Sequence, residues 1–269
     1  MKDDFVGFLQ TSESILPHLG SDIEWLIVDG SGDQQVSSWY EEYAHIKNIS
    51  YNWQSPEGIY HAMNQGINLA KGDWLWFINA SDMVISGNSL FRIKALLNGS
   101  FTAKIIATPV VYLTPKGKYF KLVKPYLKSI DGYKIAGFHH QGVFTSRSVF
   151  EKIGSFDTNL KYASDGKFLD AAVASFDYSL TNIIACGFRM GGRSMQNFIQ
   201  TISEANDYRP NSKSKIAQLL FLKNSIRKIL ITFEDSIIVN VYLRNRHERI
   251  AKELVALDSN FVPVKITSG

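Results

Sequence analysis

The alternation of strand-like and helix-like segments constrains the fold of this chain most strongly. Residues 23–33, IEWLIVDGSGD, join a short apolar run to Asp-Gly and Gly-Asp turn signals, and residues 34–46 return to helical spacing. Residues 48–53, 58–70 and 73–80 then repeat the order strand, helix, strand. This alternation predicts an α/β fold with a mainly parallel central sheet flanked by helices.

The rest of the chain departs from this alternation. Residues 4–19, DFVGFLQTSESILPHL, space their apolar side chains near the helical period, so the chain is expected to begin with an amphipathic helix. Beyond residue 87 the pattern predicts an α+β arrangement. Its expected elements are a helix at 88–98, strands near 103–113 and 117–123, a loop AGFHHQG, and a helix after YASD.

Composition excludes several classes of protein. With 269 residues, 45% of them apolar, the chain can bury a full-sized core. A charged fraction of 20% and a net charge of +4 give no reason to expect a nucleic acid partner. The single cysteine, Cys186, excludes an internal disulfide and is expected to be a small buried residue. No export signal or membrane-spanning run is evident, so cytoplasmic localisation is expected.

A change in composition marks the C-terminal part. Residues 211–252 contain nine Lys or Arg against three acids, with apolar residues at helical spacing between them. They predict amphipathic helices that either lie on an anionic membrane, at the inner face of the cell, or pack on the domain with a solvated basic face. We therefore expect a main domain at 1–200 and a basic helical extension at 201–269.

Two acidic turns end strands of the predicted sheet. Asp29 closes the strand of VDGSGD, and Asp82 closes the strand of NASD. Ligands of open α/β sheets bind beyond the carboxyl ends of the strands, so both turns should face one crevice. Taken alone, each acid is also explained as a turn residue, and Asp82 as a helix cap.

Three segments resemble a known enzyme family. They are EWLIVDGSGD, GIYHAMNQGINLAKGDWLWFINASD and HHQGVFTSRSVFEKIGSFDTNLKYASDGKFL. Together they resemble the inverting glycosyltransferases of family 2 with the GT-A fold, especially bacterial polysaccharide-assembly enzymes similar to colanic acid glycosyltransferases. The second segment is the most specific, and the likeness extends over roughly residues 4–195.

The resemblance implies a nucleotide-diphosphate sugar as donor and a glycan or polyprenyl-linked acceptor. It also implies Mn²⁺ or Mg²⁺, because a divalent cation stabilises the diphosphate leaving group and prefers carboxylate oxygens. Asp82 matches the last acid of the family's Asp-X-Asp motif and is the implied metal ligand. Ala80 and Ser81 stand where related enzymes often have another acid, which weakens the expected affinity for metal.

The same resemblance assigns the donor site. Asp29 would hold the nucleoside, and Tyr60 and Asn64 would line the donor crevice. Arg193, in the segment FRMGGRS, would contact the diphosphate, with a solvated surface position as the alternative.

On the acceptor side, Asp165 matches the catalytic base. A carboxylate is ionised at neutral pH and needs no large pKa shift for this task. The alternative is a helix N-cap, because Ser-Asp precedes an apolar run. His140 and Gln141 match a His-Gln segment that would contact the sugar or the acceptor, and both also fit a purely structural role.

One feature of the family is missing from this sequence. Members begin with a hydrophobic strand that lies centrally between the strands formed here by EWLIVD and DWLWFIN. A late start codon, a truncated gene, or another segment in that position would each explain its absence, and a genuine loss predicts weak donor binding. The competing functions are therefore a non-catalytic GT-A-like scaffold or partner subunit and a peripheral membrane-binding module.

Overall fold

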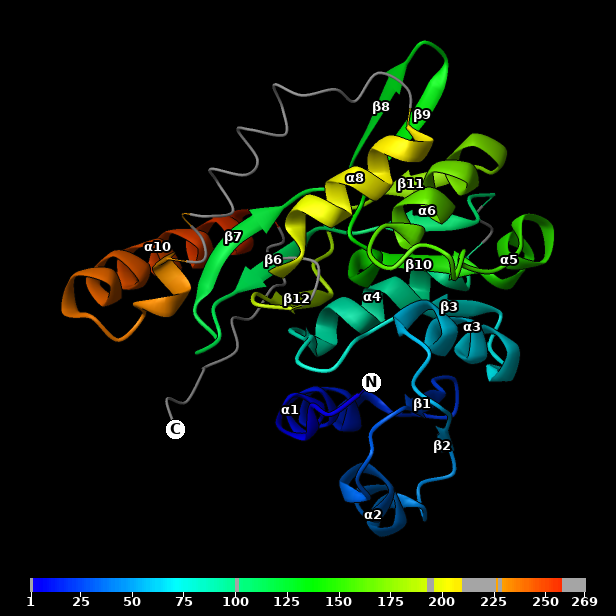
Figure 1. The fold of residues 1–269 in the computed structure, drawn as a ribbon, viewed down its shortest axis with the longest axis horizontal. Helices are drawn as coiled ribbons and strands as arrows, with labels where there is room; N and C mark the ends of the chain where they lie inside the picture. The colour runs from blue at the N-terminus through cyan, green and yellow to red at the C-terminus, as the bar shows by residue number, and fades with distance from the viewer. Residues whose placement is uncertain (1, 100–101, 193–195, 210–225, 227–228, 258–269) are drawn as a thin grey trace.

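The computed structural model describes residues 2–99, 102–192, 196–209, 226 and 229–257. Its helices are α1 (Phe5–Ile15), α2 (Gln35–Tyr43), α3 (Ile59–Leu69), α4 (Gly87–Leu97), α5 (Arg147–Ile153), α6 (Ser164–Ser175), α8 (Phe198–Tyr208) and α10 (Ile237–Leu257), with short 3-10 helices η1 (Leu16–His18) and η2 (His140–Gly142). Its strands are β1 (Trp25–Asp29), β2 (Ile49–Trp53), β3 (Trp74–Trp76), β4 (Met83–Val84), β5 (Ile105–Ala107), β6 (Val110–Leu113), β7 (Tyr119–Val123), β8 (Tyr126–Ile130), β9 (Tyr133–Gly137), β10 (Val143–Ser146), β11 (Tyr178–Leu180) and β12 (Cys186–Arg189). Figure 1 shows how these elements are arranged.

The strands form four hydrogen-bonded groups. Two sheets have four strands, β11-β5-β10-β3 and β4-β12-β6-β7, and two have two strands, β1-β2 and β8-β9. Among the described strands, only the pairs β1-β2, β5-β11 and β6-β12 are parallel, whereas β10 runs antiparallel to both of its neighbours. The expected arrangement of helices around a sheet is present, but its strand directions are mixed, because the chain enters β10 from the β8-β9 hairpin and η2 rather than from a crossover helix.

The sheet is divided at the position that the resemblance singled out. Among the described residues, β1 pairs with β2 alone and β3 is the edge strand next to β10. No described strand bridges β1 and β3. Helices connect these parts. Helix α1 stacks Phe8 on Trp25 of β1 and donates from Thr11 to the carbonyl of Asp82. Helix α3 contacts β1 while it buries Met63 in the same cluster as Leu75 of β3.

Local sequence signals explain where several helices begin and end. Asp4 caps α1 by accepting a hydrogen bond from the backbone N–H of Gly7 at 3.0 Å, and Ser86 caps α4 in the same way. Gly154 ends α5 with a φ of 96°, a conformation that glycine adopts at little cost. The predicted N-terminal helix is thus confirmed.

The C-terminal helices pack on the rest of the molecule. Helix α8 lies over α6, and α10 lies along β7 (Figure 1). Leu243, Ile250 and Leu254 of α10 are buried, and the last two share a cluster with Tyr119 of β7. Within the described part, none of the helices combines the length and the apolar content needed to cross a lipid bilayer. The division into 1–200 and 201–269 stays a prediction.

Candidate active site

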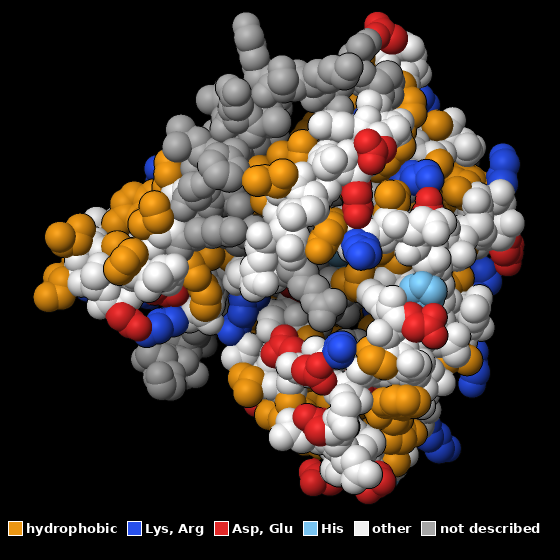
Figure 2. Space-filling model, in the orientation of Figure 1, with side chains coloured by type: hydrophobic (Ala, Val, Ile, Leu, Met, Phe, Trp, Pro, Cys, Tyr) orange, Lys and Arg blue, Asp and Glu red, His pale blue; other side chains and the backbone are white. Residues whose placement is uncertain are grey.

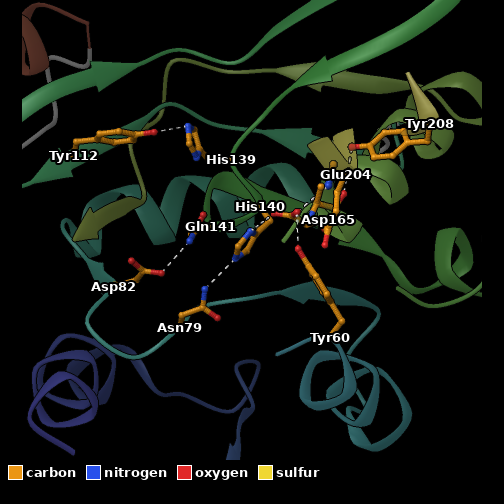
Figure 3. A network of polar contacts seen from close by, with 12 residues as sticks. Tyr60, Asn79, Asp82, Tyr112, His139, His140, Gln141, Asp165, Glu204 and Tyr208 are labelled. Atoms are coloured by element: carbon orange, nitrogen blue, oxygen red, sulfur yellow. Dashed lines mark hydrogen bonds and ion pairs between the residues drawn. The ribbon is translucent and has the colours of Figure 1, made fainter. Parts of the chain in front are cut away.

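Asp165 lies at the centre of a polar network contributed by distant parts of the chain (Figure 3). It is in the first turn of α6. One carboxylate oxygen, Oδ1, accepts hydrogen bonds from the Tyr60 hydroxyl and from the backbone N–H of Gly166, each at 2.9 Å. The other, Oδ2, lies 2.7 Å from Nδ1 of His140. Helices α3, α6 and η2 therefore converge on this carboxylate.

His140 is held at both ring nitrogens. The side-chain amide of Asn79 lies 3.1 Å from Nε2, with its Nδ2 toward the ring. An amide nitrogen only donates, so Nε2 accepts, and a neutral ring then carries its proton on Nδ1 and donates it to Asp165. Sequence reasoning did not single out Asn79, although a polar residue just beyond β3 lies on the same rim as Asp82.

His140 and Asp165 shift each other's pKa. Burial lowers the pKa of His140, but the hydrogen bond and charge of Asp165, with the charge of Asp82, outweigh it and raise the pKa overall. Burial raises the pKa of Asp165, but contacts with His140, Tyr60 and Gly166 outweigh it and keep the pKa below its usual range. Asp165 is therefore ionised at neutral pH, as the sequence predicted for a base.

Gln141 connects this network to Asp82. Its amide donates to Oδ2 of Asp82 at 3.1 Å, and the backbone N–H of Arg189 in β12 donates to Oδ1 at 3.3 Å. Asp82 is only 3% exposed. Burial raises its pKa to about 7, and the nearby charge of His140 and these hydrogen bonds offset part of that effect.

The fit of a divalent cation to Asp82 is partial. Within the described ranges, no group of three or more His, Cys, Asp or Glu side chains could hold a metal. A single carboxylate completed by water and substrate phosphates is nevertheless a common way to bind Mg²⁺. The donor chemistry of Asp82 fits that mode, but both of its oxygens already accept hydrogen bonds from the protein.

Asp29 is fully buried, and its carboxylate accepts hydrogen bonds from within its own turn. Its Oδ1 accepts hydrogen bonds from the backbone N–H and the hydroxyl of Ser31 at 2.9 and 2.7 Å. The Tyr51 hydroxyl donates to Oδ2 at 3.1 Å. These contacts agree with the turn interpretation, and a nucleoside contact stays a prediction.

The start of α1 lies between the two acidic turns. The hydroxyl of Ser31 accepts a hydrogen bond from the backbone N–H of Asp3 at 2.9 Å. On the other side, the hydroxyl of Ser81 donates to Asp4 at 3.2 Å and its N–H donates to the carbonyl of Gly7 at 2.9 Å. The turns of Asp29 and Asp82 are thus both hydrogen-bonded to residues 3–7.

Asn64 and Tyr60, which were predicted to line the donor crevice, form hydrogen bonds with other parts of the protein. The amide of Asn64 forms a pair of 2.9 Å hydrogen bonds with the backbone of Phe156, so it joins α3 to the loop after α5 instead of facing an open crevice. Tyr60 is 6% exposed and directs its hydroxyl to Asp165. Arg193 lies outside the described residues.

Glu204 and Tyr208 of α8 are further members of the site that sequence reasoning missed. Glu204 accepts hydrogen bonds from three successive backbone N–H groups, Lys161 to Ala163, just before α6. The Tyr208 hydroxyl donates to the carbonyl of Ala163 at 3.2 Å. Their spacing of four residues places both on one helix face, but no signal in the sequence connects that face with residues more than 40 positions away.

Known proteins share the sequence pattern and the fold. The model of the family described as glycosyl transferase family 2 matches residues 8–154. A PGL/p-HBAD biosynthesis glycosyltransferase of Mycobacterium bovis is 24% identical over 161 residues, which are 58% of this chain and 60% of that protein. An uncharacterized glycosyltransferase of Mycobacterium tuberculosis is 26% identical over 207 residues, which are 71% of this chain and 72% of that protein.

Solved structures show the same architecture at low sequence identity. The alignment with TarS of S. aureus has a TM-score of 0.57 at 14% identity and covers 81% of this chain and 40% of TarS. The mannosyltransferase PcManGT of Pyrobaculum calidifontis, in complex with GDP-Man and Mn²⁺, has a TM-score of 0.54 at 12% identity and covers 96% of this chain and 85% of its own. These likenesses show the GT-A fold. Since the family model also spans more than half of the sequence, the chain belongs to glycosyl transferase family 2.

Proposed function

We propose that this glycosyltransferase transfers a sugar, with inversion, from a nucleotide-diphosphate sugar to a glycan or lipid-linked acceptor in the assembly of a cell-surface polysaccharide. The observation that supports this most is the environment of Asp165. Its side chain is 25% exposed, against 3% for Asp82 and 0% for Asp29, so it is the predicted acid that a substrate can reach.

Asp165 acts as the base in this proposal. The acceptor hydroxyl oxygen attacks the anomeric carbon, the bond from that carbon to the diphosphate breaks, and the hydroxyl proton passes to Asp165. Tyr60 and the Nδ1 proton of His140 hold the carboxylate ionised and oriented. Gln141, which anchors Asp82, belongs to the wall of the sugar site rather than to proton transfer.

For the donor, we propose a diphosphate site beside the turns of Asp29 and Asp82. A TarS structure contains UDP-GlcNAc and the PcManGT structure contains GDP-Man with Mn²⁺, which supports a nucleotide sugar without choosing one. Mn²⁺ or Mg²⁺ would bring Lewis-acid stabilisation of the leaving diphosphate. Asp82 is the residue that would hold it, and Arg193, outside the described residues, stays a predicted diphosphate contact.

Calorimetry with UDP and GDP tests the donor site and separates the enzyme from a non-catalytic GT-A-like scaffold. Binding that requires Mn²⁺ and is lost in Asp82→Ala supports the enzyme. Asp207→Ala is the matched control, because Asp207 is an exposed acid on α8 and lies outside the proposed donor site. Well-folded protein that binds neither nucleotide, with or without Mn²⁺, contradicts the proposal.

A membrane surface is the second partner that we propose, because one end of the molecule exposes a cluster of apolar side chains (Figure 2). The cluster consists of Ile226, Ile229 and Phe233 before α10, and Ile237, Ile238, Val241 and Tyr242 in its first two turns. Ile237 and Ile238 are 83% and 84% exposed. The sequence of residues 211–252, to which this cluster belongs, carries nine bases against three acids, and this composition suits the inner, anionic face of a cell membrane.

Flotation with vesicles rich in phosphatidylglycerol tests that surface. The double variant Ile237→Ser/Ile238→Ser should lose most of the vesicle-bound fraction, because it removes the two most exposed apolar side chains of the cluster. Ile199→Ser is the control, since Ile199 is 64% exposed on α8. Equal flotation of all three proteins contradicts membrane attachment through α10.

A further inference from the structure

We propose that Glu204 is a positioning residue, which fixes the loop before α6 and thereby holds Asp165 in place. This inference rests on the proposed role of Asp165. Residues 161–163 precede α6 without regular structure, and their backbone N–H groups all donate to the Glu204 carboxylate. The distances are 2.9 Å from Lys161 to Oε1, and 2.8 and 3.0 Å from Tyr162 and Ala163 to Oε2.

These bonds are of a strong type. Each joins a carboxylate oxygen to a backbone N–H, and hydrogen bonds of a carboxylate to backbone N–H groups are shorter and stronger than those between neutral groups. Glu204 lies one turn before the end of α8, on a helix without a fully buried residue. Polar contacts therefore form part of the docking of α8 on α6 and its entry loop.

Two neighbours of Glu204 reinforce the same contact. The Tyr208 hydroxyl donates to the carbonyl of Ala163, and a Cβ atom built on Gly166 would lie 2.8 Å from that hydroxyl oxygen. Arg209 binds the buried Asp170 at 2.7 and 3.0 Å. The end of α8 thus contacts α6 and its entry loop on both sides of Asp165.

The geometry connects this contact to catalysis. Asp165 follows Ala163 by two residues, and its carboxylate must meet Tyr60 from α3 and His140 from η2 at once. Those partners belong to other elements, so the entry loop sets where the Asp165 side chain begins. Displacing a reacting group by about 1 Å can cost roughly 100-fold in rate.

The test compares three variants of α8. Glu204→Ala removes all three acceptor contacts, and Glu204→Gln keeps one carbonyl oxygen that can accept from Tyr162 and Ala163. Asp207→Ala, an exposed acid three residues away, is the matched control for lost charge. Hydrogen exchange over residues 160–166 and the separate values of kcat and donor KM are the measurements.

We expect faster exchange at 161–163 in Glu204→Ala, with a roughly 10- to 100-fold fall in kcat, little change in donor KM, and an intermediate result in Glu204→Gln. If Glu204 had only a structural role, Glu204→Ala would lower thermal stability but would not lower kcat selectively while donor KM stayed the same. Unchanged exchange, unchanged kcat, or the same effect in Asp207→Ala would overturn the proposal.

The proposed function can fail separately. If the well-folded wild-type protein releases no nucleoside diphosphate from any donor, the proposed transferase activity fails, and with it the role of Asp165 as a base. Exchange at 161–163 would then still decide whether Glu204 fixes the loop, because that measurement does not require turnover.

Discussion

At the residue scale, solvent exposure distinguishes the three aspartates of the candidate site. Asp165 keeps a quarter of its side-chain surface exposed, whereas Asp82 and Asp29 are almost or completely buried. The sequence identified all three acids through the turns and the family motif. It could not predict their burial, because the partners that cover them, Gln141 and Tyr51 among them, come from other parts of the chain.

The raised pKa of Asp82 gives a stability prediction. Its folded-state pKa of about 7 lies above the usual 3.8, so the folded protein binds a proton that the unfolded chain has lost. The free energy of unfolding should therefore fall as pH rises between these values, by at most about 4 kcal/mol at about 1.4 kcal/mol per pKa unit. In Asp82→Asn this loss should disappear, because the amide carries no charge.

Urea unfolding at pH 5 and pH 8 measures this effect. The variant should be more stable than the wild type at pH 8, by a larger margin than at pH 5. Asp207→Asn, which changes an exposed acid, should behave like the wild type. The same pH dependence in wild type and Asp82→Asn would show that Asp82 is not a buried acid of this kind.

At the scale of elements, the segments with strong local signals are the ones that could be predicted. Helix α3 and strand β2 were expected within about one residue of their observed ends. The β8-β9 hairpin was missed, although Asp131 and Gly132 adopt the positive φ angles of 49° and 81° that favour an Asp-Gly hairpin turn. Strand β11 has only three residues and is set by its pairing with β5, which no local pattern reveals.

A buried ion pair joins three of these elements. Asp170 of α6 is 2% exposed and accepts hydrogen bonds from the backbone N–H of Ala136 in β9 and from Arg209 after α8. Arg209→Met would leave a buried carboxylate without its cation. We expect a loss of about 3 kcal/mol in the free energy of unfolding.

The double variant Asp170→Asn/Arg209→Met provides the comparison. It removes both charges, so it should be more stable than Arg209→Met alone, as judged by urea unfolding. If the second substitution adds a further loss, the cost at this site comes from packing of the side chains and not from an unpaired charge.

At the scale of the whole molecule, the described strands form separate sheets, whereas the sequence predicted one central sheet. Strands β1 and β2 form a two-stranded sheet, and a sheet of this size is marginally stable by itself. We expect their amides to exchange hydrogen by partial unfolding at a lower free energy than those of β5 and β10, which lie inside a four-stranded sheet.

Hydrogen exchange with and without UDP or GDP measures this difference. A nucleotide that binds at the end of β1 should slow exchange in β1 and β2 more than in β5. Equal protection of β1 and β5 in the free protein would mean that the two sheets unfold as one unit.

Release of nucleoside diphosphate by Asp165→Asn tests whether Asp165 is the base of a nucleotide-sugar transferase. The asparagine keeps the size of the side chain and can still contact Tyr60 and His140, but it cannot take the acceptor proton. With a panel of UDP-, GDP- and dTDP-sugars, the donor used by the wild type should be turned over at least about 100-fold more slowly by the variant. Its affinity for the nucleoside diphosphate should stay within about twofold. Near-normal turnover by Asp165→Asn would contradict this account.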